Sequence, residues 1–217
     1  MRQRKLKWAE DYLKKTTFLV RDFPSYLAKN ALLELEIGCG KGTFLVKKAE
    51  LNPKINYLGV DIQSSCLAQA IKKAELAELD NLHFALINAE SLLEKFGANR
   101  FQSIYLNFCD PWPKARHEKR RLTNPKFLEI YYQLLLPGGE IIFKTDNQSL
   151  FDYSALTFKA SALKIISAES DYQASSDEII SEYEEKFRNK GQQIARIIAK
   201  KEKEGVINVR TRTEKTG

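Results

Sequence analysis

Short apolar runs alternate with longer segments of helical spacing along most of the chain. The runs are rich in Ile, Leu, Val and aromatic residues, which is typical of strands buried in a parallel sheet. In the segments between them apolar positions recur at helical spacing, most clearly where Cys66, Ala70 and Ala74 share one stripe. The expected strands span residues 32–37, 56–60, 82–87, 103–108, 140–144, 163–168 and 193–200. The expected helices span residues 43–51, 65–79, 89–96, 125–136, 149–162 and about 177–188.

Alternation of this kind predicts the fold class. Strands that alternate with helices form right-handed βαβ units, which give a parallel sheet covered on both faces. We expect a Rossmann-like α/β fold with a seven-stranded, mostly parallel sheet and an antiparallel pair at one edge. With 217 residues the chain has room for one such domain, expected at 31–201. We assign 1–30 to a basic N-terminal segment and 202–217 to a polar tail, and the polar character of both ends allows mobility there.

A glycine-rich loop joins the first expected strand to the first expected helix. It reads Glu36-Ile-Gly-Cys-Gly-Lys-Gly, with Gly38 and Gly40 as its first two glycines. Glycine permits a tight turn and lets a ligand approach the backbone without a Cβ in the way. The dinucleotide fingerprint is Gly-x-Gly-x-x-Gly, whereas here the third glycine comes one position early and Thr43 takes the last place. The loop therefore predicts a nucleotide-like ligand, and its spacing disfavours NAD.

Polar residues mark the carboxyl ends of the first three expected strands. Glu36 precedes the glycines, where a carboxylate suits a cationic amino acid head group better than a pyrophosphate. Asp61 ends the second strand, where it can accept hydrogen bonds from both ribose hydroxyls, and Asn88 with Ala89 ends the third, beside an adenine edge. Either acid alone could instead be a helix N-cap or a turn residue. Together they predict an adenosyl cofactor site, because ligands of open α/β sheets bind at this edge.

Composition narrows the class of protein. Hydrophobic residues make up 43% and charged residues 29%, and no apolar run approaches the roughly 20 residues of a bilayer span. The basic N-terminus lacks the apolar stretch of a signal peptide, so we expect a cytoplasmic protein with no membrane partner. Cys39, Cys66 and Cys109 are widely spaced and accompanied by only two histidines. This pattern predicts reduced core thiols and no metal site.

Positive charge is concentrated after the fourth expected strand. The net charge is +7, and five of the eight residues from 114 to 121 are Lys or Arg. They follow the loop Asp110-Pro-Trp-Pro, which two prolines stiffen. A charge run alone is most often a solvated face, but this one follows a rigid loop at the ligand edge. It therefore predicts a surface that contacts nucleic acid phosphates.

The same segment carries a family resemblance. Asp110-Pro-Trp-Pro-Lys followed by Arg-His-x-Lys-Arg-Arg resembles the signature of the bacterial tRNA (guanine-N7)-methyltransferases, the TrmB family. The likeness extends from residue 32 to about 198 and includes the glycine loop, Phe143-Lys-Thr-Asp-Asn and Ser181-Glu-Tyr-Glu-Glu-Lys-Phe. It implies the class I S-adenosylmethionine-dependent methyltransferase fold, S-adenosyl-L-methionine as methyl donor and tRNA as partner. The implied product is 7-methylguanosine at position 46 of the variable loop, made by a monomer or a homodimer.

The resemblance also implies site residues, position by position. The family's cofactor-binding residues correspond to Glu36, Asp61, Asn88 and Asp110. Its substrate-contacting residues correspond to Lys114, Asp146, Ser181, Glu182, Tyr183 and Glu184. Its RNA-interacting segment corresponds to Arg116, His117, Glu118, Lys119, Arg120 and Arg121. Two positions depart from the family: Ser181 replaces the usual Thr and loses a methyl group, and Asp61 replaces the common Glu, which shortens its reach to the ribose.

The chemistry of guanine limits what the catalytic residue must do. N7 carries an in-plane lone pair and no proton at neutral pH, so its methylation needs no general base. Catalysis then depends on alignment of N7, the methyl carbon and the sulfur. We expect Asp110 to orient the guanine through N1–H or N2–H and to favour its developing positive charge, with Asp146 sharing that role unless it only caps the next helix. We expect His117 to contact phosphate or to be merely exposed.

Three other functions fit parts of the pattern. A class I methyltransferase could act on another nucleobase atom, because Asp110-Pro-Trp-Pro is faintly similar to the Asp-Pro-Pro-Tyr of amino-methylating enzymes. An NAD-binding oxidoreductase shares the strand, glycine loop and helix but not the glycine spacing. A non-catalytic RNA-binding protein would have no need of the intact set Glu36, Asp61 and Asp110.

Overall fold

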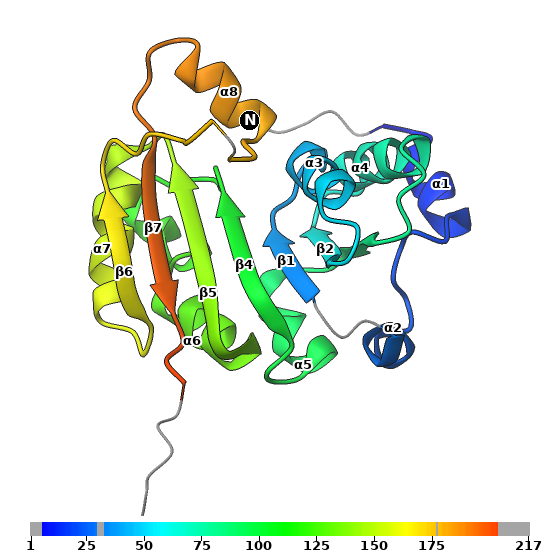
Figure 1. Ribbon diagram of the computed structural model, residues 1–217, viewed down its shortest axis with the longest axis horizontal. Coiled ribbons are helices and arrows are strands. Elements are labelled where there is room, and N and C mark those ends of the chain that lie inside the picture. Colours follow the sequence, from blue (N-terminus) through cyan, green and yellow to red (C-terminus); the bar gives the residue numbers. More distant parts are fainter. Residues whose placement is uncertain (1–5, 30–32, 177, 204–217) are drawn as a thin grey trace, which may run out of the picture.

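The computed structural model describes residues 6–29, 33–176 and 178–203, in which seven strands form one sheet (Figure 1). The spatial order is β3-β2-β1-β4-β5-β7-β6. Strands β1 to β5 pair in parallel, and β7 pairs antiparallel with β5 and β6. The mostly parallel sheet with an antiparallel edge is therefore confirmed. The strands are β1 (Leu33–Ile37), β2 (Asn56–Asp61), β3 (Leu82–Leu86), β4 (Phe101–Asn107), β5 (Leu135–Thr145), β6 (Lys164–Glu169) and β7 (Ala195–Lys200).

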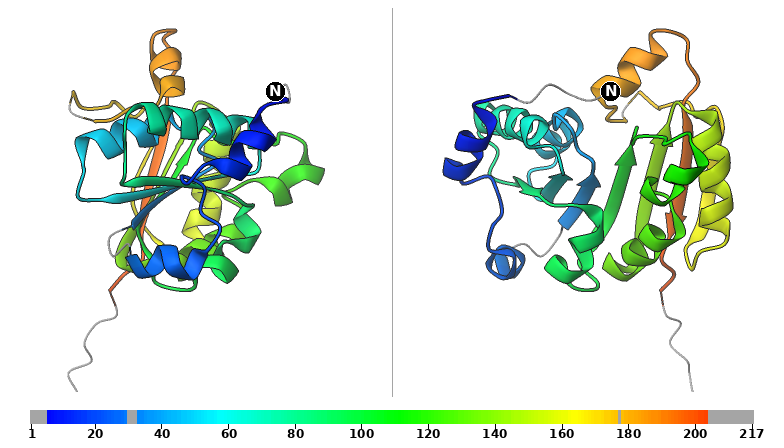
Figure 2. Two further views of the ribbon diagram at one scale, coloured as in Figure 1. Left: turned by 90° about the vertical axis from the view of Figure 1, so that its right-hand side faces the viewer. Right: turned by 180° about the vertical axis from the view of Figure 1, so that it is seen from behind.

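Helices cover both faces of the sheet (Figure 2), and one apolar core lies on each face. One core lies between the sheet and α5, α6 and α7, and includes Phe127 and Phe143. The other lies under α3 and α4, and includes Phe44 and Ile71. The helices are α1 (Ala9–Lys15), α2 (Phe23–Lys29), α3 (Thr43–Leu51), α4 (Ser64–Leu76), α5 (Leu92–Phe96), α6 (Pro125–Leu134), α7 (Gln148–Lys159) and α8 (Glu182–Arg188), with 3-10 helices η1 (Ala89–Ser91) and η2 (Ala115–Arg120).

The strand order places a ligand edge between β1 and β4. The chain runs outward from β1 through β2 to β3, then crosses back to β4 on the other side of β1. Loops that leave β1 and β4 therefore diverge to opposite faces, which opens a crevice at their carboxyl ends. In Figure 1 the orange helix α8 lies over the carboxyl ends of β4 and β5. The glycine loop, Asp110 and α8 thus share one edge of the sheet.

Strand β5 begins earlier than the sequence pattern predicts. It starts at Leu135 instead of Glu140, and α6 accordingly ends at Leu134. The apolar run at 134–136 suits a helix and a strand equally, and pairing with β4 decides the outcome. Pro137-Gly138-Gly139, which follows the helix expected at 125–136, lies within an irregular part of the strand.

The N-terminal segment contains two short helices that the sequence pattern did not predict. Helix α1 packs on α4, with Ala9 and Leu13 buried. After α1 the chain runs beside β3, where Phe84 bonds through its backbone to Phe18 and Val20. Helix α8 begins at Glu182, later than the predicted start at Asp177. Asp177 itself lies outside the described residues. So do residues 1–5 and 30–32 and most of the predicted tail, 204–217. No helix in the described part of the chain could span a membrane.

Candidate functional site

The glycine loop turns tightly against β2 and α4. Gly38, Gly40 and Gly42 have φ angles of 76°, 54° and 69°, in the left-handed region that glycine tolerates best. The amide of Gly38 donates to the carbonyl of Val60 at 2.8 Å. A Cβ on Gly42 would lie 2.7 Å from the Cβ of Ala70, so only glycine allows α4 to pack this closely. The glycines are thus required by the backbone conformation of the loop and by its close packing against α4.

Asp61 fastens the glycine loop to the end of β2. Its Oδ2 accepts from the Gly40 amide at 2.9 Å, and its Oδ1 accepts from the Gln63 amide at 2.8 Å. Burial raises the pKa of Asp61, and the negative charge of Asp110 adds to that shift. The expected turn role is therefore real, but an ionised carboxylate has about four acceptor positions and can still accept from hydroxyls.

Glu36 is a buried carboxyl group with one unpaired oxygen. The residue is 3% exposed, and its Oε1 accepts from Asn107 Nδ2 at 2.9 Å. Its Oε2 has no hydrogen-bond partner among the described residues. Burial raises the pKa of Glu36 to about 8. Since a buried acceptor without a partner is costly, this oxygen fits a ligand that brings a donor, and an ammonium group fits best.

At the end of β3, Asn88 has a local structural role. Its Oδ1 accepts from the Ser91 amide at 3.0 Å and caps η1. The side chain of Asn88 is exposed, whereas Ala89 is buried in the core. Asn88 therefore lies at the same sheet edge as Asp61.

The loop after β4 has a strained backbone that hydrogen bonds hold in place. Phe108 and Trp112 have φ angles of 51° and 42°, a costly conformation for non-glycine residues that commonly marks functional sites. The amide of Phe108 donates to the carbonyl of Lys144 at 2.9 Å, and Arg121 Nη2 donates to the Trp112 carbonyl at 3.2 Å. Asp110, between these fixed points, is exposed. The loop thus presents one carboxylate to solvent on a braced backbone.

The basic segment from residue 114 to 121 divides into outward and inward side chains. Arg121 lies over the ring of Tyr153 at 4.3 Å, and the Tyr153 hydroxyl donates to Glu118 at 3.0 Å. The rings of His117 and Trp112 pack perpendicular to each other, with centroids 5.5 Å apart. Arg120 stacks on Trp112 at 4.9 Å yet stays exposed. The side chains that remain exposed and cationic are Lys114, Arg116, Lys119 and Arg120.

Asp146 is exposed at the carboxyl end of β5 and is not a helix cap. Asn147 caps α7 instead, since its Oδ1 accepts from the Leu150 amide at 2.8 Å. The alternative in which Asp146 only caps the next helix is therefore wrong. Asp146 and Gln148 line a small polar hollow of about 190 Å³ with residues from the loops around β6 and β7. The carboxylate is thus available to a ligand.

The stretch from Ser181 to Glu184 also divides in two. Ser181 Oγ accepts from the Glu184 amide at 3.1 Å and caps α8. Glu184 is 1% exposed, and both of its oxygens are bonded to cationic side chains. Glu182 and Tyr183 are exposed; Glu182 accepts from the Thr43 hydroxyl at 3.3 Å, and Tyr183 stacks on Phe108 at 6.4 Å. Only Glu182 and Tyr183 are therefore open to a ligand in this structure.

Sequence reasoning missed Asn107 and Lys144. Asn107 ends β4 and Lys144 is the penultimate residue of β5. Each has a polar side chain that reaches an acidic partner more than thirty positions away in sequence. The polar residue at the end of an otherwise apolar run was the available signal. Cys39 and Cys66 are buried, as expected of core thiols, whereas Cys109 is half-buried. Burial raises the pKa of all three thiols. Within the described residues no cluster of His, Cys, Asp or Glu could hold a metal.

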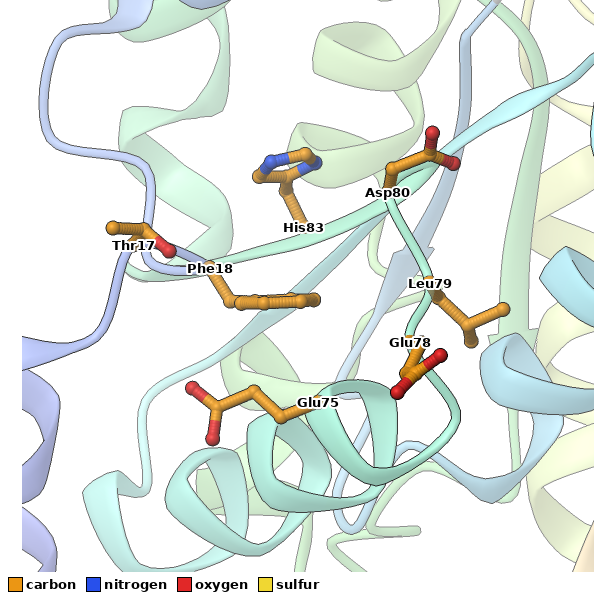
Figure 3. A pocket seen from close by; sticks show the side chains of 7 residues that line it. All are labelled: Thr17, Phe18, Glu75, Glu78, Leu79, Asp80 and His83. Atoms are coloured by element: carbon orange, nitrogen blue, oxygen red, sulfur yellow. The ribbon is translucent and has the colours of Figure 1, made fainter.

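A larger hollow lies elsewhere, at the amino end of β3 (Figure 3). Its lining includes Phe18, Glu75, Asp80 and His83. Glu75 is already bonded to Tyr12 and Thr16, and His83 packs on the ring of Phe18. Since ligands of this fold bind at the carboxyl ends of the strands, the hollow is not part of the candidate site.

Known proteins match this chain over most of its length. Residues 30–197 match a family model described as a putative methyltransferase. The tRNA (guanine-N(7)-)-methyltransferase of Oceanobacillus iheyensis is 41% identical over 213 residues, which cover 94% of this chain and 100% of the relative. The enzyme of the same name from Listeria innocua is 43% identical over 213 residues, covering 92% and 98%.

Solved structures match the fold. A 16S rRNA (adenine(1408)-N(1))-methyltransferase from Catenulisporales acidiphilia superposes with a TM-score of 0.62 at 11% identity, over 85% of this chain and 92% of that one. The 16S rRNA methyltransferase KamB gives 0.62 at 13% identity, over 83% and 93%. At such identities they establish the class I S-adenosylmethionine-dependent methyltransferase fold alone, as expected. The closely similar full-length relatives go further, and the chain belongs to the tRNA (guanine-N(7)-)-methyltransferase family.

Proposed function

We propose that the protein transfers a methyl group from S-adenosyl-L-methionine to N7 of a guanine in tRNA, giving 7-methylguanosine. The names of its relatives supply the reaction. The structural observation that carries it is that Asp110 follows β4 at the same sheet edge as the glycine loop after β1. A buried acid and a glycine loop lie on one side, and exposed cations on a braced loop lie on the other.

The glycine loop and its acids would hold the cofactor. Glu36 would accept a hydrogen bond from the ammonium group in the methionine part of the cofactor. This group would supply the donor that Glu36 Oε2 lacks within the protein. Gly38 and Gly40 allow close approach of the backbone, and Asp61 would accept from the ribose hydroxyls. The adenine would lie near Asn88 and Ala89, and Asp110 closes the site. The bound sulfonium supplies the methyl group, and these residues call for no metal.

The exposed cations would hold the tRNA backbone. Lys114, Arg116, Lys119 and Arg120 would contact phosphates, which is the usual source of nucleic acid affinity. His117, Glu118 and Arg121 would act mainly by shaping this segment, because each already has a partner in the protein. The family resemblance implies a variable-loop guanosine as target. We retain the expectations of a cytoplasmic place of action and of a monomer or homodimer.

Asp110 and Asp146 would act on the base. Guanine N7 has no proton to lose, so the protein need only orient the ring and favour its developing positive charge. Asp110 would accept from N1–H or N2–H, and Asp146, exposed and not engaged as a cap, would assist. His117 has no proton to remove and would not take part in the chemistry.

The test is incubation with labelled S-adenosylmethionine and tRNA that lacks the modification, followed by nucleoside analysis. We expect label in 7-methylguanosine alone. Label in another methylated nucleoside would favour the alternative target atom instead. Binding of S-adenosylmethionine and tRNA without turnover would favour the non-catalytic RNA-binding protein.

A further inference from the structure

Lys144 has its ammonium group enclosed in the protein. The residue is 3% exposed, near the carboxyl end of β5. Its Nζ lies 2.7 Å from Glu178 Oε1 and 3.0 Å from Glu184 Oε2. The other oxygen of Glu184 accepts from Arg188 Nη2 at 2.8 Å. Both oxygens of Glu184 are therefore committed to partners within the protein.

Aromatic and cationic side chains complete the surroundings of Lys144. Glu178 accepts from the Tyr172 hydroxyl, and its Oε2 lies 3.6 Å from Arg196 Nη1. The ring of Tyr172 lies 4.8 Å from Lys144 Nζ and 3.7 Å from the Arg196 guanidinium. We call the following set the Lys144 cluster: Lys144, Tyr172, Glu178, Glu184, Arg188 and Arg196. It connects β5 and β7 to α8 and to the segment that precedes α8.

A contribution to folding stability does not by itself explain the Lys144 cluster. Charges buried in pairs lose much of their attraction to the cost of desolvation, and apolar residues of similar size often stabilise a protein as well. What buried ion pairs can supply is one specific arrangement. Helix α8 has 7 residues, too few to hold its place without tertiary contacts. The cluster fixes its register, and that register puts Tyr183 on Phe108 and Glu182 beside Thr43.

We propose that Lys144 is a positioning residue for methyl transfer. Through Glu178 and Glu184 it docks α8 over the site, so that Glu182 and Tyr183 face the tRNA between the glycine loop and the Asp110 loop. Ser181 and Glu184 then serve the docking, as cap and anchor, and do not touch the tRNA. This inference rests on the proposed function.

The test is Lys144→Met, which removes the ammonium and leaves the buried carboxylate of Glu184 and the half-buried one of Glu178 without it. Helix α8 should separate from β5, and a misplacement of about 1 Å can cost about 100-fold in rate. We expect single-turnover methylation at saturating tRNA to fall about 100-fold, with the dissociation constant of S-adenosylmethionine within about twofold of wild type. Amides of residues 181–188 should lose protection from hydrogen exchange, whereas those of β1 to β4 keep it.

A matched control is Lys164→Met, which removes an exposed ion pair between Lys164 on β6 and Glu202 after β7. Lys164 Nζ lies 2.7 Å from Glu202 Oε1, and both side chains are more than 60% exposed. All three measurements should stay at wild-type values. Glu184→Gln keeps the Lys144–Glu178 pair and the shape of the anchor, and should lower rate and α8 protection together by a smaller factor. It carries the test if Lys144→Met does not fold.

Three results would overturn the inference. The first is a wild-type methylation rate in Lys144→Met, and the second is a loss that lies wholly in cofactor affinity. The third is a Glu184→Gln variant that loses rate while α8 keeps its protection, because that would indicate direct contact of Glu184 with the base. Failure of the proposed function looks different: wild type would make no 7-methylguanosine, while hydrogen exchange would still report whether Lys144 docks α8.

Discussion

The candidate site has two halves that are held in different ways. The cofactor half consists of Glu36, the glycine loop and Asp61, and hydrogen bonds at the ends of neighbouring strands hold it. Loop amides donate to Val60 and Asp61, and the Asn107 side chain donates to Glu36. The tRNA half consists of η2 and α8, and side chains from distant parts of the chain hold it. Arg121 rests on Tyr153, and Lys144 binds Glu184.

This difference corresponds to the two ligands. A small cofactor needs a tight, preformed pocket, which glycines and strand ends can build locally. An RNA needs projecting charged side chains, and short helices can present them only when buried partners fix their position. Substitutions in the cofactor half should therefore change one binding constant, whereas those in the tRNA half should change geometry and ionic behaviour.

The largest effect is expected where the halves meet, at Asp110. Asp110→Asn removes the charge that would favour the developing cation, so single-turnover methylation at saturating substrates should fall on the order of 100-fold. His117→Ala is the companion variant, and it should act on tRNA affinity instead of rate. An active Asp110→Asn beside an inactive His117→Ala that binds tRNA normally would reverse the assignment.

Next in size is Glu36→Gln, which tests the cofactor half. Loss of a charge-assisted hydrogen bond should weaken S-adenosylmethionine binding by about 1.5–3 kcal/mol, measured by calorimetry. Glu34→Gln is a control on the same strand and the same face. Glu34 is equally buried but already bonded to Tyr105 and Lys48, so its loss should lower stability and spare cofactor affinity. Equal affinity losses in the two variants would contradict the assignment.

A smaller effect concerns pH. The pKa of Glu36 is raised to about 8, so without ligand the carboxyl is mostly protonated below that pH. An ammonium group favours the charged form, and binding must then release a proton. Cofactor affinity should rise about tenfold from pH 6 to pH 7 and peak near pH 8, where the ligand's own α-amino group begins to lose its charge. Calorimetry in buffers of different ionisation enthalpy measures the proton, and Glu36→Gln should abolish its release.

The smallest effect per residue belongs to the exposed cations of the tRNA half. Arg116→Glu and Lys119→Glu should each reduce the slope of log affinity for tRNA against log salt by roughly 0.7–0.9, with cofactor binding unchanged. Arg121→Gln offers the contrast, because Arg121 is bonded to Trp112 and stacked on Tyr153. It should loosen η2 with little change in slope. An unaltered slope in the first two variants would mean that the run is a solvated face.

Sequence reasoning recovered what local patterns determine. The strand ends, the glycine loop and Asp61 follow from spacing of a few residues. The role of Glu184 does not, since its partner Lys144 lies 40 positions away and only folding brings them together. Helices α1 and α2 were missed because each has 7 residues and depends on tertiary packing more than on its own pattern. The start of β5 was misplaced because three leucines in a row fit either structure.

The backbone hydrogen bonds between Phe84 on β3 and the segment that follows α1 have a consequence for self-association. Open sheet edges attract further strands, and long-lived aggregates grow from them. Here the hydrogen bonds from Phe84 to Phe18 and from Val20 to Phe84 close one edge of the sheet. The opposite edge, β6, carries an exposed Lys164 and a break in register after Ile165, both of which discourage pairing. Removing residues 1–21 would expose the backbone of β3, and the shortened protein should self-associate.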